Sequence, residues 1–319
     1  MMRKIIFLLL ILVVIFCAGC AATTNKQAKT THSFTVTDAR GKELIFSSKP
    51  QSIISLYVFG DEILLGLVDH KRIAGLSKWV HDPGLSMAVQ EASDVTKVAE
   101  NNPEAILALK PDLILLPDTT KQEQIASLED LNLKVFVYHS PTRLDNIGVT
   151  IKEMGNAVGE PKMAETLINN MQQKLRTVEE KAKQIPPKER KNALLFLRFG
   201  AIGGQGIIFN DLLSAAGIED CYNRARPQGT EKAGTSRILS KEEIVKANPD
   251  YLIMGSWTQG GAYKATNEQL QEIYNDPSLA SVTAVKKKQA IIIPQSYVNC
   301  LSHHAAESVE HLYKVVYEK

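Results

Sequence analysis

One short phrase occurs twice in this chain, and it constrains the fold more than any other feature of the sequence. Residues 103–115 and 241–253 share the frame Glu-x-Ile-x4-Pro-Asp-x-(Leu/Ile)-(Leu/Ile). Each copy predicts a short helix, a turn at the Pro-Asp pair and a buried strand. Two distant copies are too few for a solenoid, which needs at least three adjacent repeats. The repeat therefore indicates two similar lobes with a cleft between them.

The segments around the repeat alternate between strand and helix patterns. A β-hairpin is expected at 34–46. Strands are expected after it at 52–56, 72–75, 113–116 and 134–138. Helices are expected at 61–67, 103–109, 122–131 and 146–158. After the repeat in the second half, a strand at 290–293 and a closing helix at 302–317 are expected. Such alternation predicts mainly parallel sheets. Between a strand at 193–197 and a helix at 208–216, the glycines of 200–206 predict a loop.

The longest periodic segment lies between the two copies of the repeat. It begins at Pro161 and ends before Pro186, and at 1.5 Å per residue it would span roughly 30 Å. Its apolar face consists of Ala164, Leu167, Ile168, Met171, Leu175, Val178 and Ala182. We therefore expect an α/β fold of two Rossmann-like lobes with mainly parallel sheets, bridged by one long α-helix. The expected boundaries are 34–160 for the first lobe, 161–185 for the linking helix and 186–319 for the second lobe.

The N-terminus has the pattern of a targeting segment. Arg3 and Lys4 precede an apolar run at 5–16, and Cys17-Ala18-Gly19-Cys20 resembles the lipobox of bacterial lipoproteins, although that motif usually has Leu in place of Cys17. The resemblance implies a signal peptide at 1–19, a lipid on Cys20 and a flexible tether at 20–33. Ordinary secretion is the alternative. Either way, the chain is expected outside the cytoplasmic membrane, on its outer face or in the periplasm.

Composition narrows the classes of partner. The formal net charge is +2, and Lys and Arg are interspersed with Asp and Glu, so no nucleic-acid partner is expected. If Cys20 carries lipid, Cys221 and Cys300 remain, either as a disulfide or as two buried thiols. Apart from Cys17 and Cys20 of the lipobox-like segment, the chain has no Cys-x2-Cys spacing, so no zinc site is indicated.

The two repeated glutamates have the same predicted position on their helices. Asn102 and Ser240 are suitable N-cap residues, which places Glu104 and Glu242 second in each helix, and Glu243 would complete a capping box with Ser240. An acid at this position interacts favourably with the helix dipole, by roughly 0.3–1 kcal/mol. That effect explains either residue singly but not the pair. Two matching acidic positions suit docking onto a two-fold partner that bears cations.

Several segments together resemble one known family. The residues that carry the resemblance are 49–56, Gly66-Leu67-Val68, Ile73-Ala74-Gly75, both copies of the repeat, and Ala215-Ala216-Gly217. From Phe34 onward, the chain resembles the substrate-binding lipoproteins of ABC importers for iron-siderophores, haem or cobalamin (periplasmic-binding-protein class III). The resemblance implies a monomeric, non-enzymatic receptor without a cofactor. It also implies that Glu104 and Glu242 dock on arginine pockets of a permease dimer, which works with its ATPase.

The ligand would be a small-molecule metal chelate held between the lobes, near the carboxyl ends of the strands. The candidate contacts are Tyr57, Trp79, His81, Arg198, Trp257, Tyr297 and His303. Arg198 could pair bidentately with a carboxylate or phosphate, or form a salt bridge between the lobes. The aromatic residues could instead serve packing. A haem ligand could come from Tyr57, His81, Tyr297 or His303.

Other functions are open at this stage. His303, Glu307 and His311 form a stripe that would suit a metal-dependent hydrolase, although the His-Glu-x2-His order is absent. The glycines at 200–206 lack a nucleotide-binding spacing, which argues against a nucleotide-dependent oxidoreductase. A receptor for free zinc or manganese is a further alternative. We assign no catalytic residue and no metal ligand, and we expect a ferric siderophore as the cargo, with haem or cobalamin as alternatives.

Overall fold

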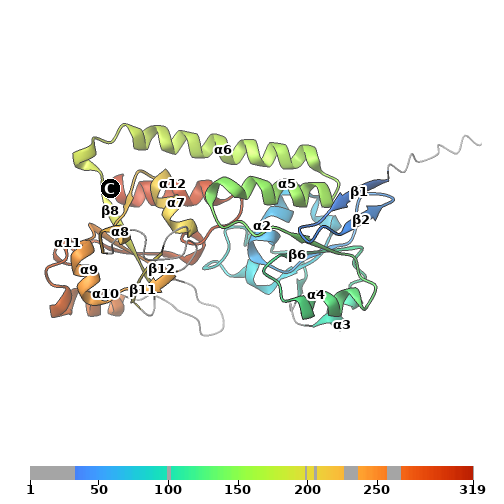
Figure 1. Cartoon of the computed structure of the whole chain (residues 1–319), viewed down its shortest axis with the longest axis horizontal. Coiled ribbons are helices and arrows are strands. Elements are labelled where there is room, and N and C mark those ends of the chain that lie inside the picture. Colours follow the sequence, from blue (N-terminus) through green and yellow to red (C-terminus); the bar gives the residue numbers. More distant parts are fainter. Residues whose placement is uncertain are drawn as a thin grey trace, which may run out of the picture. The chain divides into compact units, whose positions relative to one another are not determined.

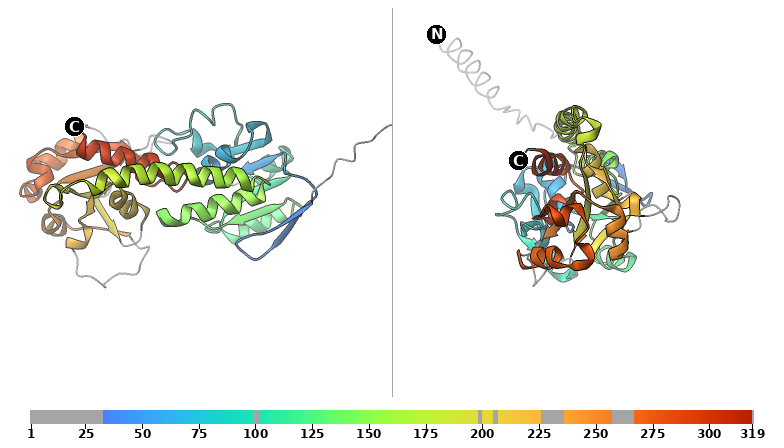
Figure 2. Two further views of the ribbon diagram at one scale, coloured as in Figure 1. Left: turned by 90° about the horizontal axis from the view of Figure 1, so that it is seen from above. Right: turned by 90° about the vertical axis from the view of Figure 1, so that its left-hand side faces the viewer.

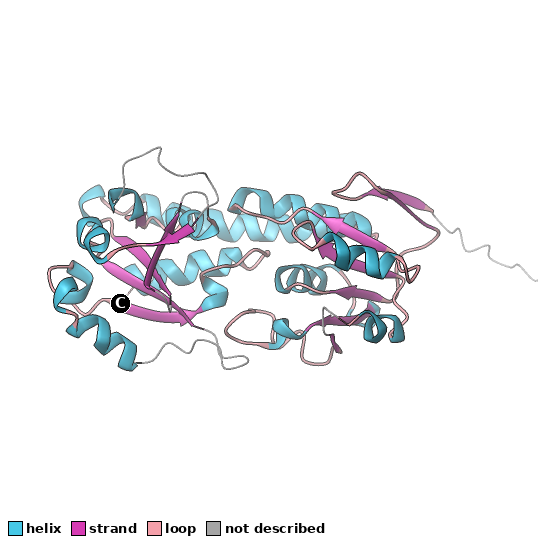
Figure 3. Cartoon of the chain, turned by 60° about the horizontal axis from the view of Figure 1, so that its bottom comes forward, coloured by secondary structure: helices cyan, strands magenta, loops and turns pink. Residues whose placement is uncertain are grey.

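Two β-sheets, each built around one copy of the repeated phrase, form the framework of the fold (Figures 1 and 3). The computed structural model describes residues 33–98, 102–197, 200–204, 207–225, 236–256 and 267–318. Residues Phe34–Lys319 form one compact unit. Within this unit, we call the part before helix α6 (Pro161–Lys183) the first lobe and the part after it the second lobe.

The sheet of the first lobe is entirely parallel. Its strand order is β5-β4-β3-β6-β7. The strands are β3 (Ile53–Ser55), β4 (Ile73–Ser77), β5 (Lys97–Val98), β6 (Leu113–Pro117) and β7 (Val135–Tyr138). β3, β6 and β7 are fully buried, as their continuous apolar sequences predict for strands covered on both faces. The hairpin of β1 (Phe34–Thr37) and β2 (Glu43–Phe46) is confirmed as an antiparallel pair.

The helices of the first lobe follow the predicted segments closely. They are α2 (Val58–Leu67), α3 (Pro103–Ala108), α4 (Gln122–Glu129) and α5 (Ile147–Ala157), with 3₁₀-helices η1 (His70–Arg72), η2 (Lys78–His81) and η3 (Leu144–Asn146). α2 begins three residues before the expected start at Asp61, because Tyr57 already serves as its N-cap.

The sheet of the second lobe is mixed. Its order is β11-β9-β8-β12-β13, and β10 also pairs with β8. β8 (Asn192–Leu197), β12 (Tyr251–Ser256), β13 (Ala290–Pro294) and β10 (Glu219–Asp220) are parallel, whereas β9 (Gly200–Gly204) and β11 (Ser236–Ile238) pair antiparallel. The second-lobe helices are α7 (Ile208–Ala215), α8 (Tyr222–Ala225), α9 (Lys241–Ala247), α10 (Asn267–Asn275), α11 (Thr283–Lys286) and α12 (Ala305–Tyr317), with η4 (Pro187–Glu189), η6 (Pro277–Leu279) and η7 (Gln295–Tyr297).

The predicted glycine loop is wrong over residues 200–204, which form strand β9. Gly200 has φ of +121°, which lets the chain turn back from β8 into an antiparallel strand. Gly203 packs against the ring of Tyr222, where a Cβ atom would lie 1.7 Å from Cδ2. The glycines therefore serve a tight turn and close ring packing. Residues 205 and 206 lie outside the described part of the chain.

The two copies of the repeat adopt the same local structure. Lys110 and Asn248, at equivalent positions, have φ of 50° and 45°, so both helices end in a left-handed residue before the Pro-Asp turn. The following strand then pairs with the first strand of its own sheet, β6 with β3 and β12 with β8.

The repeated aspartates fix that pairing by the same hydrogen bond. Asp112 accepts from the backbone N–H groups of Gln51 and Ser52, at 2.6 and 3.0 Å. Asp250 accepts from the backbone N–H of Asn192, at 3.1 Å. Each aspartate thus ties the turn of the repeat to the start of the neighbouring strand.

Helix α6 contacts both lobes. It packs on α2 and α5 of the first lobe and on α7 and α12 of the second (Figures 1 and 2). Its buried residues are Ala164, Met171, Leu175, Val178 and Ala182. All of these except Ala182 join one apolar core that also includes residues of both sheets. The bridged two-lobed fold is therefore confirmed, whereas the lobe boundaries at 160/161 and 185/186 stay predictions.

Candidate functional site

A cavity of about 160 Å³ lies where the two lobes meet, and we call it the junction pocket. The first lobe contributes residues from α2, η2 and the segment after η2, and the second lobe contributes residues 295–301. The described lining residues are Val58, Phe59, Glu62, Trp79, Leu85, Gln295, Ser296, Asn299, Cys300 and Leu301. These segments follow the carboxyl ends of β3, β4 and β13, where ligands of parallel sheets are expected.

A buried carboxylate stands at this pocket. Glu62 is 3% exposed, and its Oε1 accepts hydrogen bonds from Ser86 Oγ at 2.7 Å and from the backbone N–H of Met87 at 2.8 Å. Its Oε2 accepts from Ser302 Oγ of the second lobe at 2.5 Å. Glu62 therefore joins the two lobes through a hydrogen bond to a charged acceptor.

A second bond joins the lobes nearby. The backbone N–H of Ser296 in η7 donates to the carbonyl oxygen of Gly84 at 2.8 Å. The loop at Gly84 is in turn held by Asp82, whose Oδ1 accepts from the Gly84 N–H at 2.7 Å. Two hydrogen bonds, Ser302–Glu62 and Ser296–Gly84, therefore connect the two walls of the junction pocket.

Asp61 lies beside Glu62 in the chain and is fully buried. Its Oδ2 accepts from the backbone N–H and the hydroxyl of Ser77, at 3.1 and 2.5 Å. Burial raises the pKa of the Asp61 carboxyl well above its usual range, and the hydrogen bonds from Ser77 oppose that change. The Asp61 carboxyl braces β4 against α2 behind the pocket.

The sequence reasoning missed Glu62. The only local signal is an acid pair, Asp61-Glu62, directly before the apolar run Ile63-Leu64-Leu65. In the helix expected at 61–67, both acids would fall in the first turn, where an acid usually has an electrostatic explanation. In α2, which begins at Val58, only Asp61 lies in the first turn. The partner that shows the role of Glu62 lies far away in sequence, at Ser302.

Of the predicted ligand contacts that the structure describes, Trp79 alone lines the junction pocket. Its ring lies under the Nζ atom of Lys78, 4.5 Å from the ring centroid. Tyr57 is half-buried at the N-cap of α2, with its ring centroid 6.4 Å from that of Phe59. His81 is half-buried in η2, and burial lowers its pKa. Arg198 and Trp257 lie outside the described residues.

Tyr297 and His303 are engaged in packing. The Tyr297 ring stacks on His311 of α12, with centroids 4.2 Å apart. A Cβ atom on Gly66 of α2 would lie 3.3 Å from His303 Cε1 and 3.0 Å from a methyl of Leu167 of α6, so the imidazole sits beside both helices. Burial, followed by the nearby cations, lowers the pKa of His303 to about 3. A ligand contact by either residue stays a prediction.

The histidine stripe is divided among different partners. Glu307 pairs with Lys174 of α6, while His311 stacks on Tyr297. His303 lies next to His304, with ring centroids 4.1 Å apart.

Cys221 and Cys300 are separate, buried, free thiols, so the disulfide alternative is not realised. The Cys221 thiol donates to the carbonyl oxygen of Ala193 at 3.2 Å. Burial raises the pKa of Cys221 and raises that of Cys300 to about 12. Both are therefore unreactive as thiolates near neutral pH.

The glutamates of the repeat are both exposed on the first turns of α3 and α9. The predicted caps are confirmed: the Asn102 side chain accepts a first-turn N–H at 3.0 Å, and Ser240 and Glu243 form the reciprocal capping box. The pKa of Glu242 is lowered by its hydrogen bonds to the first-turn backbone and to Ser240. The docking role of Glu104 and Glu242 stays a prediction.

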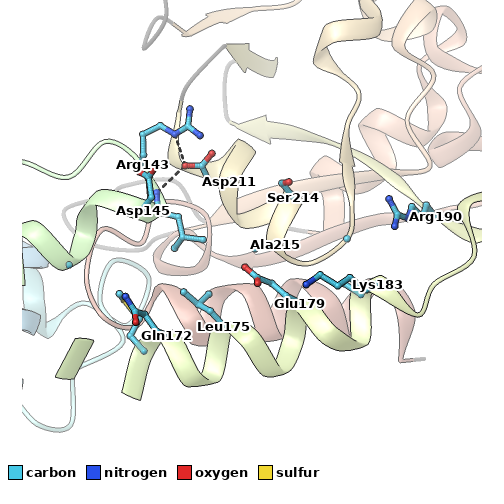
Figure 4. Close-up of a pocket in the computed structure, with 15 residues that line it drawn as sticks. Arg143, Asp145, Gln172, Leu175, Glu179, Lys183, Arg190, Asp211, Ser214 and Ala215 are labelled. Carbon is cyan, nitrogen blue, oxygen red and sulfur yellow. Dashed lines mark hydrogen bonds and ion pairs between the residues drawn. The ribbon is translucent and has the colours of Figure 1, made fainter. Parts of the chain in front are cut away.

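A larger cavity of about 490 Å³ lies alongside α6 and is also lined by residues of η3 and α7 (Figure 4). At one end, Asp211 accepts from Arg143 Nε at 2.9 Å and from the backbone N–H of Leu144 at 3.0 Å, which joins the lobes on this side as well. Lys183 and Arg190 lie toward the other end (Figure 4). Within the described chain, none of the residues predicted as ligand contacts lines this cavity.

Comparison with known proteins places this architecture. Residues 53–297 match the family model described as periplasmic binding protein. The chain is similar to an uncharacterised ABC transporter substrate-binding lipoprotein, YvrC, of Bacillus subtilis, with 23% identity covering 99% of this chain and 97% of that protein. A cobalamin-binding protein of Halobacterium salinarum is 24% identical over 70% of this chain and 59% of its own length.

A solved structure has the same fold. It is a protein from Staphylococcus epidermidis described as a possible iron-binding periplasmic solute-binding protein, with a TM-score of 0.68 and 23% identity, and the match covers 85% of this chain and 100% of that chain. Within the described residues, no helix combines the length and apolar character needed to cross a membrane. Because the family model spans well over half of the sequence, the chain belongs to the periplasmic binding protein family.

Proposed function

We propose that this chain is the extracytoplasmic receptor of an ABC importer, which holds a metal chelate at the junction pocket and delivers it to a permease dimer. The main support is the equivalence of the two copies of the repeat. Each lobe presents one exposed glutamate, Glu104 or Glu242, at the same position of the same local structure. A pseudo-symmetric pair of acids suits a two-fold partner with two cationic sites.

Attachment to the membrane through a lipid on Cys20 is part of this proposal. Cys20 lies outside the described residues, so the support comes from the sequence motif at 17–20 and from the similar protein YvrC, which is named a lipoprotein. A tether at 20–33 would keep the receptor close to its permease.

A ferric siderophore is the first candidate for the cargo. Pockets for drug-sized ligands measure roughly 300–1,000 Å³. At about 160 Å³, the junction pocket accepts one edge of such a chelate, which Trp79 would contact. The second candidate is a corrinoid, since a similar protein is named cobalamin-binding. Haem is the remaining alternative within the same class.

The ligand class is decided by the absorption spectrum of protein purified from its native host. A ferric siderophore gives a charge-transfer band, a corrinoid gives its own visible spectrum, and haem gives a Soret band. Failure to retain or rebind any of the three chelates at micromolar concentration would contradict the proposed function.

The docking role is tested by the double variant Glu104→Lys, Glu242→Lys. We expect ligand affinity to stay unchanged and permease-dependent uptake in reconstituted vesicles to be abolished, because each lobe would then present a cation to a cationic site. The matched control is Glu123→Lys, Glu268→Lys, which reverses exposed first-turn acids on α4 and α10, one in each lobe outside the repeat. Uptake should persist in the control. Equal loss in both double variants would refute the assigned roles.

A further inference from the structure

The carboxylate of Glu62 is almost completely removed from solvent, at 3% exposure. A buried carboxylate persists in a fold only when hydrogen-bond donors satisfy it. Glu62 has three such donors in this structure: the hydroxyls of Ser86 and Ser302 and the backbone N–H of Met87. The group therefore has a full set of strong, charge-assisted hydrogen bonds.

The donors come from opposite sides of the junction pocket. Oε1 binds the Ser86–Met87 segment of the first lobe, which adjoins the lining residue Leu85. Oε2 binds Ser302 of the second lobe, which follows the lining residues Cys300 and Leu301. Glu62 also lines the pocket itself. The Glu62 side chain thus bonds to both walls and also lines the pocket between them.

Ser302 also connects Glu62 to helix α12. Its Oγ donates to Glu62 and accepts from the backbone N–H of His304, the N-cap of α12, at 3.2 Å. α12 packs on both α6 and α7. If the lobes rotate apart at the pocket, the Ser302 bond must break, which leaves one oxygen of a buried charge without its donor.

We propose that Glu62 is a positioning residue that fixes the separation of the two pocket walls, and that its bond to Ser302 sets how long a ligand is retained. The first part, that Glu62 fixes the separation of the walls, follows from the structure alone. The statement on ligand retention rests on the proposed function.

Two serines that bind the same carboxylate provide a matched comparison. Ser302→Ala and Ser86→Ala each remove one hydroxyl donor to Glu62, the first between the lobes and the second within the first lobe. A merely structural role for Glu62 predicts that both variants lose similar thermal stability and behave alike otherwise. A positioning role predicts that only Ser302→Ala changes the distance between the two lobes. Ser302→Thr keeps a hydroxyl and should restore wild-type behaviour.

The first measurement needs no ligand. Spin labels are attached to the exposed positions Glu123→Cys on α4 and Glu268→Cys on α10, and the distance between them is measured by pulsed electron resonance. Of the four native cysteines, Cys221 and Cys300 are buried and do not react with the label, and Cys17 and Cys20 are replaced by serine in every variant. The distance distribution should broaden in Ser302→Ala, and it should match wild type in Ser86→Ala and Ser302→Thr. An unchanged distribution in Ser302→Ala, or equal broadening in Ser86→Ala, would overturn the proposal.

The second measurement uses cyanocobalamin and a ferric trihydroxamate as probes, in parallel. For the probe that binds, we expect dissociation about tenfold faster from Ser302→Ala, as follows from losing one hydrogen bond to a charged group. Ser86→Ala should change it less than about twofold. Equal rates in the two variants would refute the retention role. If neither probe binds the wild type, the proposed function is in error, while the distance measurement still decides the role of Glu62.

Discussion

His303 illustrates how burial decides the charge of a single side chain. Its pKa is lowered to about 3 in the folded protein, against about 6.5 for an exposed histidine in the unfolded chain. The folded state therefore holds the ring neutral, and the unfolded state takes up a proton first as the pH falls. The stability that this residue contributes is present above pH 6.5 and is lost progressively between about pH 6.5 and pH 3.

The resulting prediction concerns the acid stability of the protein. Between pH 6.5 and pH 5, His303 should lower the free energy of unfolding by about 2 kcal/mol, at about 1.4 kcal/mol per pH unit. Urea unfolding followed by circular dichroism measures this slope. In His303→Gln, the part of the slope that is due to the imidazole should disappear. Identical slopes in wild type and variant would contradict the assigned burial.

His139 provides a control with the opposite sign. Its hydrogen bond to Glu153 raises its pKa, so its contribution to stability is present below the unfolded value and is lost as the pH rises through the folded one. Its side chain is 56% exposed, so the contribution is small. His139→Gln should therefore leave the loss of stability between pH 6.5 and pH 5 almost unchanged, or slightly steeper.

At the scale of single residues, sequence predicts what is local. The caps at Asn102 and Ser240 follow from neighbours within one turn, and both are found. The bond between Glu62 and Ser302 joins positions 240 residues apart, which no local pattern specifies. For the same reason, the packing of His303 beside α2 and α6 is not predicted from the sequence, since these partners are also distant in sequence.

Among the elements, the packing of α5 on α6 depends on small residues at the crossing. A Cβ atom on Gly155 would lie 2.4 Å from the Cβ of Ala164, whereas on Gly148 of the same helix the nearest atom would be 3.7 Å away. The two glycines therefore differ: Gly155 permits close approach of the helices, whereas Gly148 has room for a methyl group in ordinary contact with Ile168.

Two alanine substitutions test this difference. Gly155→Ala should lower the free energy of unfolding by about 1–3 kcal/mol, because the added methyl forces α5 and α6 apart. Gly148→Ala should raise it by about 0.5–1 kcal/mol, because alanine favours the helix and meets no clash. Chemical denaturation of both variants measures the two values. If Gly155→Ala were as stable as Gly148→Ala, the close α5–α6 contact would be refuted.

Elements with continuous apolar sequences are predicted well, and those with a tertiary cause are not. β3, β6, β8 and β12 are found where buried parallel strands are expected. β9 is missed because its glycines, read locally, favour a loop. Its pairing with β8 and β11 and the position of Tyr222 make a strand the stable state. The second-lobe sheet is therefore mixed where the first-lobe sheet is parallel.

For the whole molecule, the repeat predicts two lobes, but it does not predict how strongly they are joined. One apolar core includes Leu113 of β6, Met171 of α6 and Ile253 of β12. Three polar connections add to it, at Glu62–Ser302, at Gly84–Ser296 and at Arg143–Asp211. Each lobe also has a smaller apolar cluster that contains no residue of α6, but the largest core spans both sheets and α6, so the lobes should not unfold independently.

We therefore expect a single cooperative unfolding transition, although chains of this length often unfold through intermediates. One probe lies in each lobe. In a Trp257→Phe variant, fluorescence reports only Trp79 of the first lobe, while alkylation of the buried Cys221, located by mass spectrometry of its peptide, reports the second. The two probes should give the same urea midpoint, because loss of either lobe exposes the shared face of α6. A lower midpoint for Trp79 than for Cys221 would mean that the first lobe unfolds alone, and the joined core would then not account for the stability of the molecule.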